Sequence, residues 1–359
     1  MMQILQKRPP ALKLRAGILA RQIIEKEGLH ARQIDIIPGA AGGPKGIGIQ
    51  GLDQAIFDTF LPQSSQRRTL IGSSIGSWRF ASILAWGAKE GTQRLAELYT
   101  NLYFDRKMSR QTVAQICQNM LIELIQGKEQ QLLDHPDYHL TIISIKAQHI
   151  FQSDKALPLL ASIAGIIGSN ALARKHNRWF MQRVISQPAI GTQFNVKDEF
   201  FTHYHSLSSQ NITPWLLASA SIPGVMSAIR DIPDAPKGSY RDGGLIDYHL
   251  DLPFQSQGIV LYPHFSDRIT PGWFDKMLKN RQANPENQAR TLLISPSADY
   301  LQSLPLGRLP DRKDFTLKGL DQKKRIQMWN QCVAESQRLG DEFLEMLEKQ
   351  NFSSFLNNF

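Results

Sequence analysis

Residues 72–76 have the spacing that a nucleophilic serine requires. They read Gly72-Ser73-Ser74-Ile75-Gly76, which is the pattern G-x-S-x-G, after an apolar stretch at 68–72 and before a predicted helix at 75–87. A serine on a strained turn from strand to helix needs a glycine two residues to either side, because side chains there would clash. Ser74 has both glycines and is the candidate nucleophile. A tight turn capped by serine is the structural alternative.

A glycine-rich loop lies some thirty residues earlier, at 39–51. Such a loop can cradle a phosphate, hold a developing oxyanion or only turn a corner. Its Gly46-x-Gly48-x-x-Gly51 matches the dinucleotide-binding fingerprint, but no acidic residue follows in 64–74, where ribose would need one. A P-loop requires Gly-Lys-Ser/Thr, whereas this loop has Pro44-Lys45-Gly46. Both nucleotide sites are therefore disfavoured.

A serine hydroxyl also needs a base to take its proton, usually a histidine that a carboxylate orients. None of the nine histidines lies in a distinctive setting. Asp242-Gly243-Gly244 is more distinctive, because two glycines leave the preceding carboxylate uncovered. An ordinary Asp-Gly turn is the alternative. A triad in which His249 or His264 is the base also stays open.

The three motifs, in this order, resemble those of the patatin-like phospholipase family. Its loop is G-G-G-x-[KR]-G, its elbow G-x-S-x-G and its third motif D-G-[GA]. Here the loop reads Ala41-Gly42-Gly43-Pro44-Lys45-Gly46, and "ASASIPGV" at 218–225 is similar to the family's Ala/Ser-rich segment. The resemblance covers about residues 33–255. The chain departs from the pattern at Ala41 and at Pro44, which has no N–H to donate.

The resemblance implies a catalytic dyad of Ser74 and Asp242 without histidine. Asp242 would accept the serine proton during attack on an ester, and an acyl-serine intermediate would form. Backbone N–H groups of Gly42 and Gly43 would form the oxyanion hole, helped by the dipole of the helix after Ser74. Lys45 and Gly46 would support the loop, Lys45 through polar contacts to nearby carbonyls.

The activity that the resemblance implies is hydrolysis of lipid acyl esters, as a phospholipase or carboxylesterase. An acyltransferase or thioesterase would use the same dyad, and a lipid-binding module without catalysis could keep the same fold. No cofactor is expected. Asp247, His249 and Asp251 would share one face of a strand and could hold a metal. We expect a hydrogen-bonded network there and no metal.

The elements that must position these residues alternate between strand and helix. Strands are predicted at 33–38, 68–72, 138–147, 258–265 and 290–297. Helices are predicted at 45–60, 75–87, 91–103, 110–126 and 213–229, the last of them broken at Pro223 and Gly224. This alternation predicts an α/β fold of three layers, with helices flanking a mostly parallel sheet. We expect one domain over 1–359, its motif-bearing core at about 33–255, with a helix at 11–28 and a helical region at 321–350 packed on it.

The amino-acid composition restricts the classes of partner that this chain is expected to bind. The chain has 359 residues and a net charge of +9. Its basic residues are scattered and lack the aromatic interleaving of single-strand nucleic-acid binders, so a lipid or phospholipid substrate and contact with an anionic membrane are favoured over nucleic acid. Two distant cysteines fit a reducing, cytoplasmic location.

Residues 156–173 contain no charged side chain. This length is close to the lower limit for a membrane-spanning helix. Pro158 and several small or polar residues weaken that interpretation. The sequence favours a buried or hinge-like pair of helices. A surface that faces acyl chains and a membrane span are the alternatives.

Overall fold

The computed structural model describes residues 9–359 except 106, 192 and 279. Its described strands form one ten-stranded sheet in the order β10-β1-β9-β8-β2-β3-β4-β5-β6, with β7 paired to β4. The strands are β1 (Leu12–Ala16), β2 (Ile34–Gly39), β3 (Arg68–Ser73), β4 (Tyr138–Ala147), β5 (Met181–Pro188), β6 (Thr202–Leu207), β7 (Tyr240–Asp242), β8 (Ile259–Pro263), β9 (Thr291–Pro296) and β10 (Leu356–Asn357).

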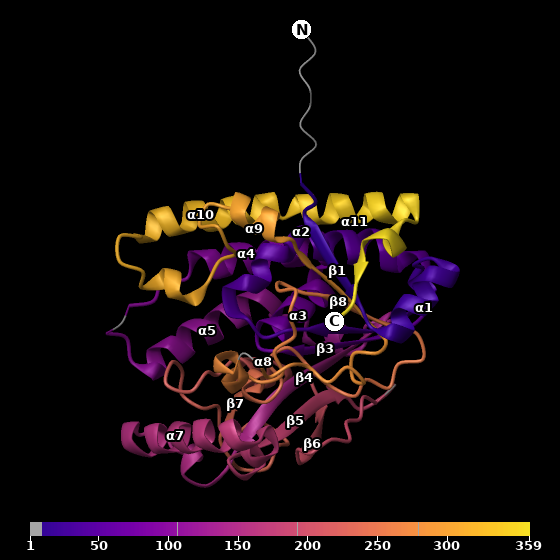
Figure 1. Cartoon of the computed structure of the whole chain (residues 1–359). Coiled ribbons are helices and arrows are strands. Elements are labelled where there is room, and N and C mark those ends of the chain that lie inside the picture. The colour runs from indigo at the N-terminus through magenta and orange to yellow at the C-terminus, as the bar shows by residue number, and fades with distance from the viewer. Residues whose placement is uncertain (1–8, 106, 192, 279) are drawn as a thin grey trace.

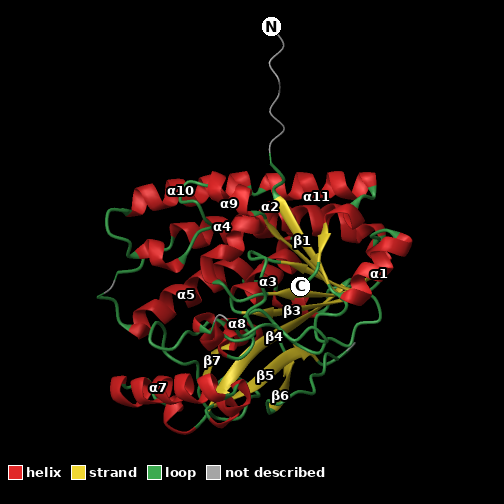
Figure 2. Ribbon diagram, viewed as in Figure 1, coloured by secondary structure: helices red, strands yellow, loops and turns green. Residues whose placement is uncertain are grey.

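Helices flank this sheet (Figures 1 and 2). They are α1 (Ile18–Glu27), α2 (Gln50–Gln54), α3 (Ile75–Trp86), α4 (Ala88–Asn101), α5 (Arg110–Ile125), α6 (Glu129–Leu133), α7 (Ala156–Leu172), α8 (Ile212–Ser219), α9 (Ala298–Ser303), α10 (Gln322–Glu335) and α11 (Gln337–Lys349). The neighbours from β9 through β8, β2 and β3 to β4 are all parallel. The predicted α/β fold with a mostly parallel sheet is therefore confirmed.

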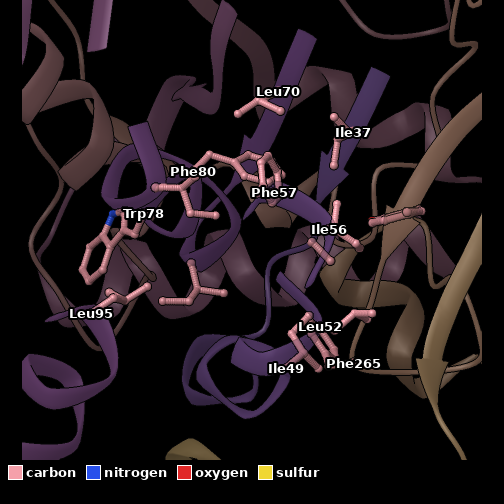
Figure 3. Packing of buried hydrophobic residues seen from close by; sticks show 14 of the residues in the cluster. Ile37, Ile49, Leu52, Ile56, Phe57, Leu70, Trp78, Phe80, Leu95 and Phe265 are labelled. Carbon is pink, nitrogen blue, oxygen red and sulfur yellow. The ribbon is translucent and has the colours of Figure 1, made fainter. Parts of the chain in front are cut away.

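Alternation of side chains along the central strands builds a core on each face of the sheet. On one face, Ile37 of β2 and Leu70 of β3 belong to the same buried cluster as Trp78 and Phe80 of α3 (Figure 3). The neighbouring positions Ile36 and Ile71 belong to a second cluster. Its other members include Phe194, Val196, Leu250 and Leu252 from irregular segments. Strands buried on both faces read as continuous apolar runs, which is why the sequence identifies them.

The predicted helix at 11–28 is wrong in its first part. Residues Leu12–Ala16 form β1, which pairs antiparallel with β9, and the helix begins at Ile18. Burial alternates along β1, as in a strand whose faces differ. Gly17 separates the two elements and lies against the backbone, since a Cβ there would be 1.9 Å from the Gln288 carbonyl oxygen. Residues 1–8 of the predicted single domain lie outside the described residues.

The predicted pair of helices at 156–173 is also wrong, because α7 is one continuous helix of 17 residues. Pro158 lies in its first turn, where the missing N–H costs no intrahelical hydrogen bond. Within the described part of the chain, no helix is both long and apolar enough to cross a membrane.

Two other helical predictions had different outcomes. The helix predicted at 213–229 ends at Ser219, before the predicted break at Pro223. The helical region predicted at 321–350 is confirmed as α10 and α11, which meet at Ser336.

Candidate active site

Ser74 and Asp242, which are 168 positions apart in the chain, meet at the carboxyl end of β3. The Ser74 hydroxyl donates a hydrogen bond to Asp242 Oδ2 over 3.0 Å. Both residues are buried, with 5% and 6% of their surface exposed. Ser74 has φ 55° and ψ −126°. This backbone conformation is strained for a residue other than glycine and is typical of a nucleophile at a sharp turn.

The flanking glycines permit this turn because backbone lies against both of them. A Cβ on Gly76 would be 1.9 Å from the carbonyl oxygen of Gly39, at the end of β2. A Cβ on Gly72 would be 2.4 Å from the backbone nitrogen of Ser77. Any larger residue at either position would push β3, α3 and β2 apart, so the G-x-S-x-G spacing has a steric cause here.

Asp242 is held at the end of a short strand. β7 pairs antiparallel with β4, and the Asp242 backbone N–H donates to the Ser221 carbonyl over 3.0 Å. Its Oδ1 accepts a hydrogen bond from the Gly244 N–H over 2.7 Å. A Cβ on Gly243 would be 2.3 Å from the Ile143 carbonyl oxygen, so the first glycine of D-G-G allows this strand pairing.

The environment of Asp242 suits a proton acceptor. Burial raises the pKa of its carboxyl to about 6, opposed by the Gly244 N–H, the positive charge of Arg312 and the Ser74 hydroxyl. At neutral pH the group is therefore ionised and accepts the serine's hydrogen bond. A general base is most effective with a pKa near the working pH.

A second serine, Ser219, holds the turn in place and had no predicted role. Its hydroxyl accepts a hydrogen bond from the Ser74 N–H over 2.8 Å and donates to the Ile143 carbonyl over 2.5 Å. It also lies 2.9 Å from the Ser77 hydroxyl. Ser219 belongs to the Ala/Ser-rich segment at 218–225, so that segment was the available signal.

The glycine loop borders the same space. Gly42 and Gly43 each line a pocket that also contains Ser74. No described residue accepts a hydrogen bond from either N–H, while that of Ala41 donates to the Tyr248 carbonyl over 2.9 Å. The N–H of Ile75, in the first turn of α3, has no acceptor within its helix. Gly42, Gly43 and Ile75 thus all line pockets that contain Ser74.

Gly46 and Lys45 connect the glycine loop to neighbouring segments. A Cβ on Gly46 would lie 2.8 Å from Ile75 Cγ1, so this glycine lets the loop pack on α3. Lys45 reaches the Asp311 carboxylate over 3.4 Å, rather than the predicted carbonyls, and lies 5.6 Å from the centre of the Phe265 ring.

Two cations without a sequence motif lie at or near the site. Arg312 lines both pockets that contain Ser74. Lys276 lies 3.7 Å from the centre of the Tyr248 ring. Its pKa is lowered by desolvation and by the nearby charges of Lys45 and Arg312, although much of the side chain faces solvent. Both cations lie on segments between 270 and 315, where the sequence offered no functional motif.

Two largely apolar pockets meet at Ser74. One encloses about 470 Å³ of empty space, partly open to solvent, and is lined by Ile163, Leu245 and Trp273 besides Ser74 and Asp242. The other comprises about 1130 Å³ of empty space, also partly open to solvent, and extends past Trp78 and Phe104. Apolar walls on both sides of a buried hydroxyl suit an acyl chain.

The candidate histidines lie elsewhere. His249 and His264 are packed ring to ring with centres 4.3 Å apart, and neither hydrogen-bonds to Ser74. Burial lowers the pKa of His249 well below its usual value, and His264 also contributes. Burial likewise lowers the pKa of His264 to about 3. Both rings are therefore neutral at physiological pH.

The carboxylates beside His249 take separate partners. Residues 247–251 are not a strand, and Asp247 forms an ion pair with Arg183. Asp251 accepts hydrogen bonds from the Asn284 N–H and the Gln288 amide. In the described ranges, no three His, Cys, Asp or Glu side chains are grouped to hold a metal.

Comparisons with known proteins give little. No family model matches the sequence, and no curated protein matches it. Among solved structures, the chain is similar to the human GIVD cytosolic phospholipase A2, with 10% identity and a TM-score of 0.36. The match covers 96% of this chain and 66% of that one. This TM-score is too low to support a function. The functional assignment therefore rests on the geometry at Ser74.

Proposed function

We propose that this protein is a serine-dependent lipid acyl hydrolase, a phospholipase or carboxylesterase of the patatin-like kind. The observation that carries the proposal is the hydrogen bond from the strained Ser74 to the buried carboxylate of Asp242. Ser74 is the proposed nucleophile and Asp242 its base. Gly42, Gly43 and Ile75 are the proposed donors to the oxyanion.

The proposed reaction has two halves. As Ser74 Oγ bonds to the ester carbonyl carbon, its proton passes to Asp242, and the carbonyl oxygen becomes an oxyanion. The bond to the alcohol then breaks, and Asp242 returns the proton to the departing oxygen. Water then attacks the carbonyl carbon of the acyl-serine while Asp242 takes its proton. The bond to Ser74 Oγ breaks, Asp242 returns the proton to that oxygen, and the carboxylic acid leaves. Removing a single oxyanion donor typically costs about 3–4 kcal/mol of transition-state stabilisation.

The apolar pockets beside Ser74 support a long-chain acyl substrate. The net charge of +9 supports contact with an anionic lipid surface. Cys117 and Cys332 are free thiols, which fits the predicted cytoplasmic location.

Hydrolysis of p-nitrophenyl esters tests the roles of the side chains. We expect Ser74→Ala and Asp242→Asn each to abolish turnover, and His249→Ala to retain it if it folds. If turnover were lost in His249→Ala and retained in Asp242→Asn, a histidine triad would replace the proposed dyad. Failure of the wild-type protein to hydrolyse any ester would reject the proposed activity.

A further inference from the structure

Helix α7 exposes an uninterrupted apolar face. Leu157, Leu160 and Leu172 are 82%, 62% and 81% exposed, and Ile167 is 44% exposed. The other exposed positions of α7 are alanine or glycine: 156, 161, 164, 168 and 171. A surface helix of a globular protein ordinarily turns charged or polar residues outward. The whole outer face of α7 therefore lacks the side chains that water would favour.

The opposite face anchors α7 to the rest of the molecule. Leu159 and Ile166 belong to a buried cluster with Phe151, Phe274 and other residues of the sheet and its loops. The helix is thus firmly attached, and its apolar outer face does not reflect a detached segment. In Figure 1, α7 lies at the lower edge of the molecule, far from α10 and α11.

The apolar face continues into the rim of the candidate active site. Ile163 of α7 lines the pocket that contains Ser74 and Asp242, and Trp273 lines the same pocket. Trp273 begins the short helix Trp273–Met277, which contacts α7. Trp273 is 39% and Met277 81% exposed. An apolar surface therefore extends from outside the molecule to the mouth of the pocket.

The charges around this surface have one predominant sign. Residues 155–179 contain four Lys or Arg and no Asp or Glu. Asp154 precedes them, and Arg174 is paired with Glu199, Asp247 and Asp275, so the exposed positive charges are the lysines. Lys155, Lys175 and Lys276 are exposed. Trp179, which is exposed, follows Arg178. Apolar side chains bordered by Lys, Arg and Trp are typical of segments that lie in the interface of an anionic bilayer.

We propose that the outer face of α7, with Trp179, Trp273 and Met277, docks on an anionic lipid bilayer and sets the pocket of Ser74 against it. The choice of a bilayer rests on the positive rim and on the continuity with a pocket that suits acyl chains. This inference builds on the proposed lipid hydrolase function, since it names the surface from which that site receives its substrate.

Binding to vesicles tests the docking surface apart from catalysis. In a Ser74→Ala background, sedimentation with phosphatidylcholine vesicles containing phosphatidylglycerol should show strong binding, and pure phosphatidylcholine much weaker binding. Leu157→Glu with Leu160→Glu should weaken binding at least tenfold. The matched control is Ile18→Glu with Leu19→Glu, in the first turn of α1, which is well separated from α7 in Figure 1. It should bind normally.

A separate variant, Leu172→Glu, repeats the test at the other end of α7, and thermal melts establish that each variant is folded. Unchanged binding by folded α7 variants would overturn the proposal, as would equal binding to neutral vesicles. So would a wild-type dimer, seen by light scattering, that the α7 variants dissociate, because a second copy would then cover the face.

Activity assays separate this proposal from the function on which it rests. With Ser74 intact, the α7 variants should hydrolyse a soluble p-nitrophenyl ester at the wild-type rate and lose hydrolysis of vesicle lipids. Absence of ester hydrolysis by the wild-type protein would reject the function while vesicle binding still tested the surface. Equal loss on soluble and vesicle substrates would contradict a docking role.

Discussion

The Ser219 hydroxyl accepts a hydrogen bond from the backbone N–H of Ser74 over 2.8 Å, so a residue at the end of α8 fixes the turn after β3. Ser219→Ala would leave this buried N–H without an acceptor, which costs about 1–3 kcal/mol. We expect lower unfolding free energy and a lower kcat/KM for ester hydrolysis. Ser221→Ala is the control, because its hydroxyl binds the Ser227 carbonyl instead. If both variants lost kcat/KM equally, Ser219 would have no specific role in positioning Ser74.

The pH dependence of activity follows from the burial of Asp242, which raises the pKa of its carboxyl to about 6. Only the ionised carboxylate can accept the serine proton. We therefore expect kcat/KM to be constant at neutral pH and to fall about tenfold per pH unit below the pKa. Rates on a soluble ester between pH 4 and 8 measure this. An acid limb near pH 4, the usual range of aspartate, would contradict the assignment.

The same burial means that the ionised Asp242 destabilises the folded protein. Folding raises the pKa of this carboxyl from 3.8 to about 6. The resulting loss of unfolding free energy is complete at pH values above the pKa in the folded state and disappears below the pKa in the unfolded state. Asp242→Asn should therefore raise the unfolding free energy at pH 7 by up to about 3 kcal/mol, while abolishing activity. Denaturant titrations at pH 7 and pH 4 measure both values. A loss of stability at pH 7 would refute this account.

Substitution by alanine should have opposite effects on stability at Gly76 and at Gly168. Gly76→Ala would place Cβ 1.9 Å from the Gly39 carbonyl oxygen, and we expect it to lose activity and about 1–3 kcal/mol of stability. Gly168 lies within α7 with no atom within 4 Å of its added Cβ. Gly168→Ala should stabilise the protein by roughly 1 kcal/mol, because alanine favours helix. Thermal melts compare the two, and destabilisation by Gly168→Ala would count against the helix as described.

The sequence predicted the parts of the fold whose cause is local. The apolar run at 138–147 matches β4, and the glycines around Ser74 predicted the turn between β3 and α3. β1 was missed because its partner, β9, lies far away in the chain, and five alternating residues are a weak local signal. Uncharged residues at 156–173 could not distinguish a buried helix from one whose outer face is exposed.

Some residues of the candidate site could likewise be predicted from local sequence, and others could not. Ser74, Asp242 and the glycine loop stand in short motifs, so their types and spacing identified them. Lys276 and Arg312 stand in no motif. Only the path of the chain between 270 and 315 brings Arg312 to the pockets of Ser74 and Lys276 to the ring of Tyr248. The alternatives His249 and His264 looked equally suitable in sequence, because burial and hydrogen-bond partners, which disfavour them, depend on the fold.

Intact-mass spectrometry after exposure to a fluorophosphonate tests the central claim most directly, since this reagent labels a serine only where it is an activated nucleophile. We predict that the wild-type protein gains the mass of one adduct and that Ser74→Ala gains none. An adduct that persists in folded Ser74→Ala, or a wild-type protein that remains unlabelled, would contradict the assignment of Ser74.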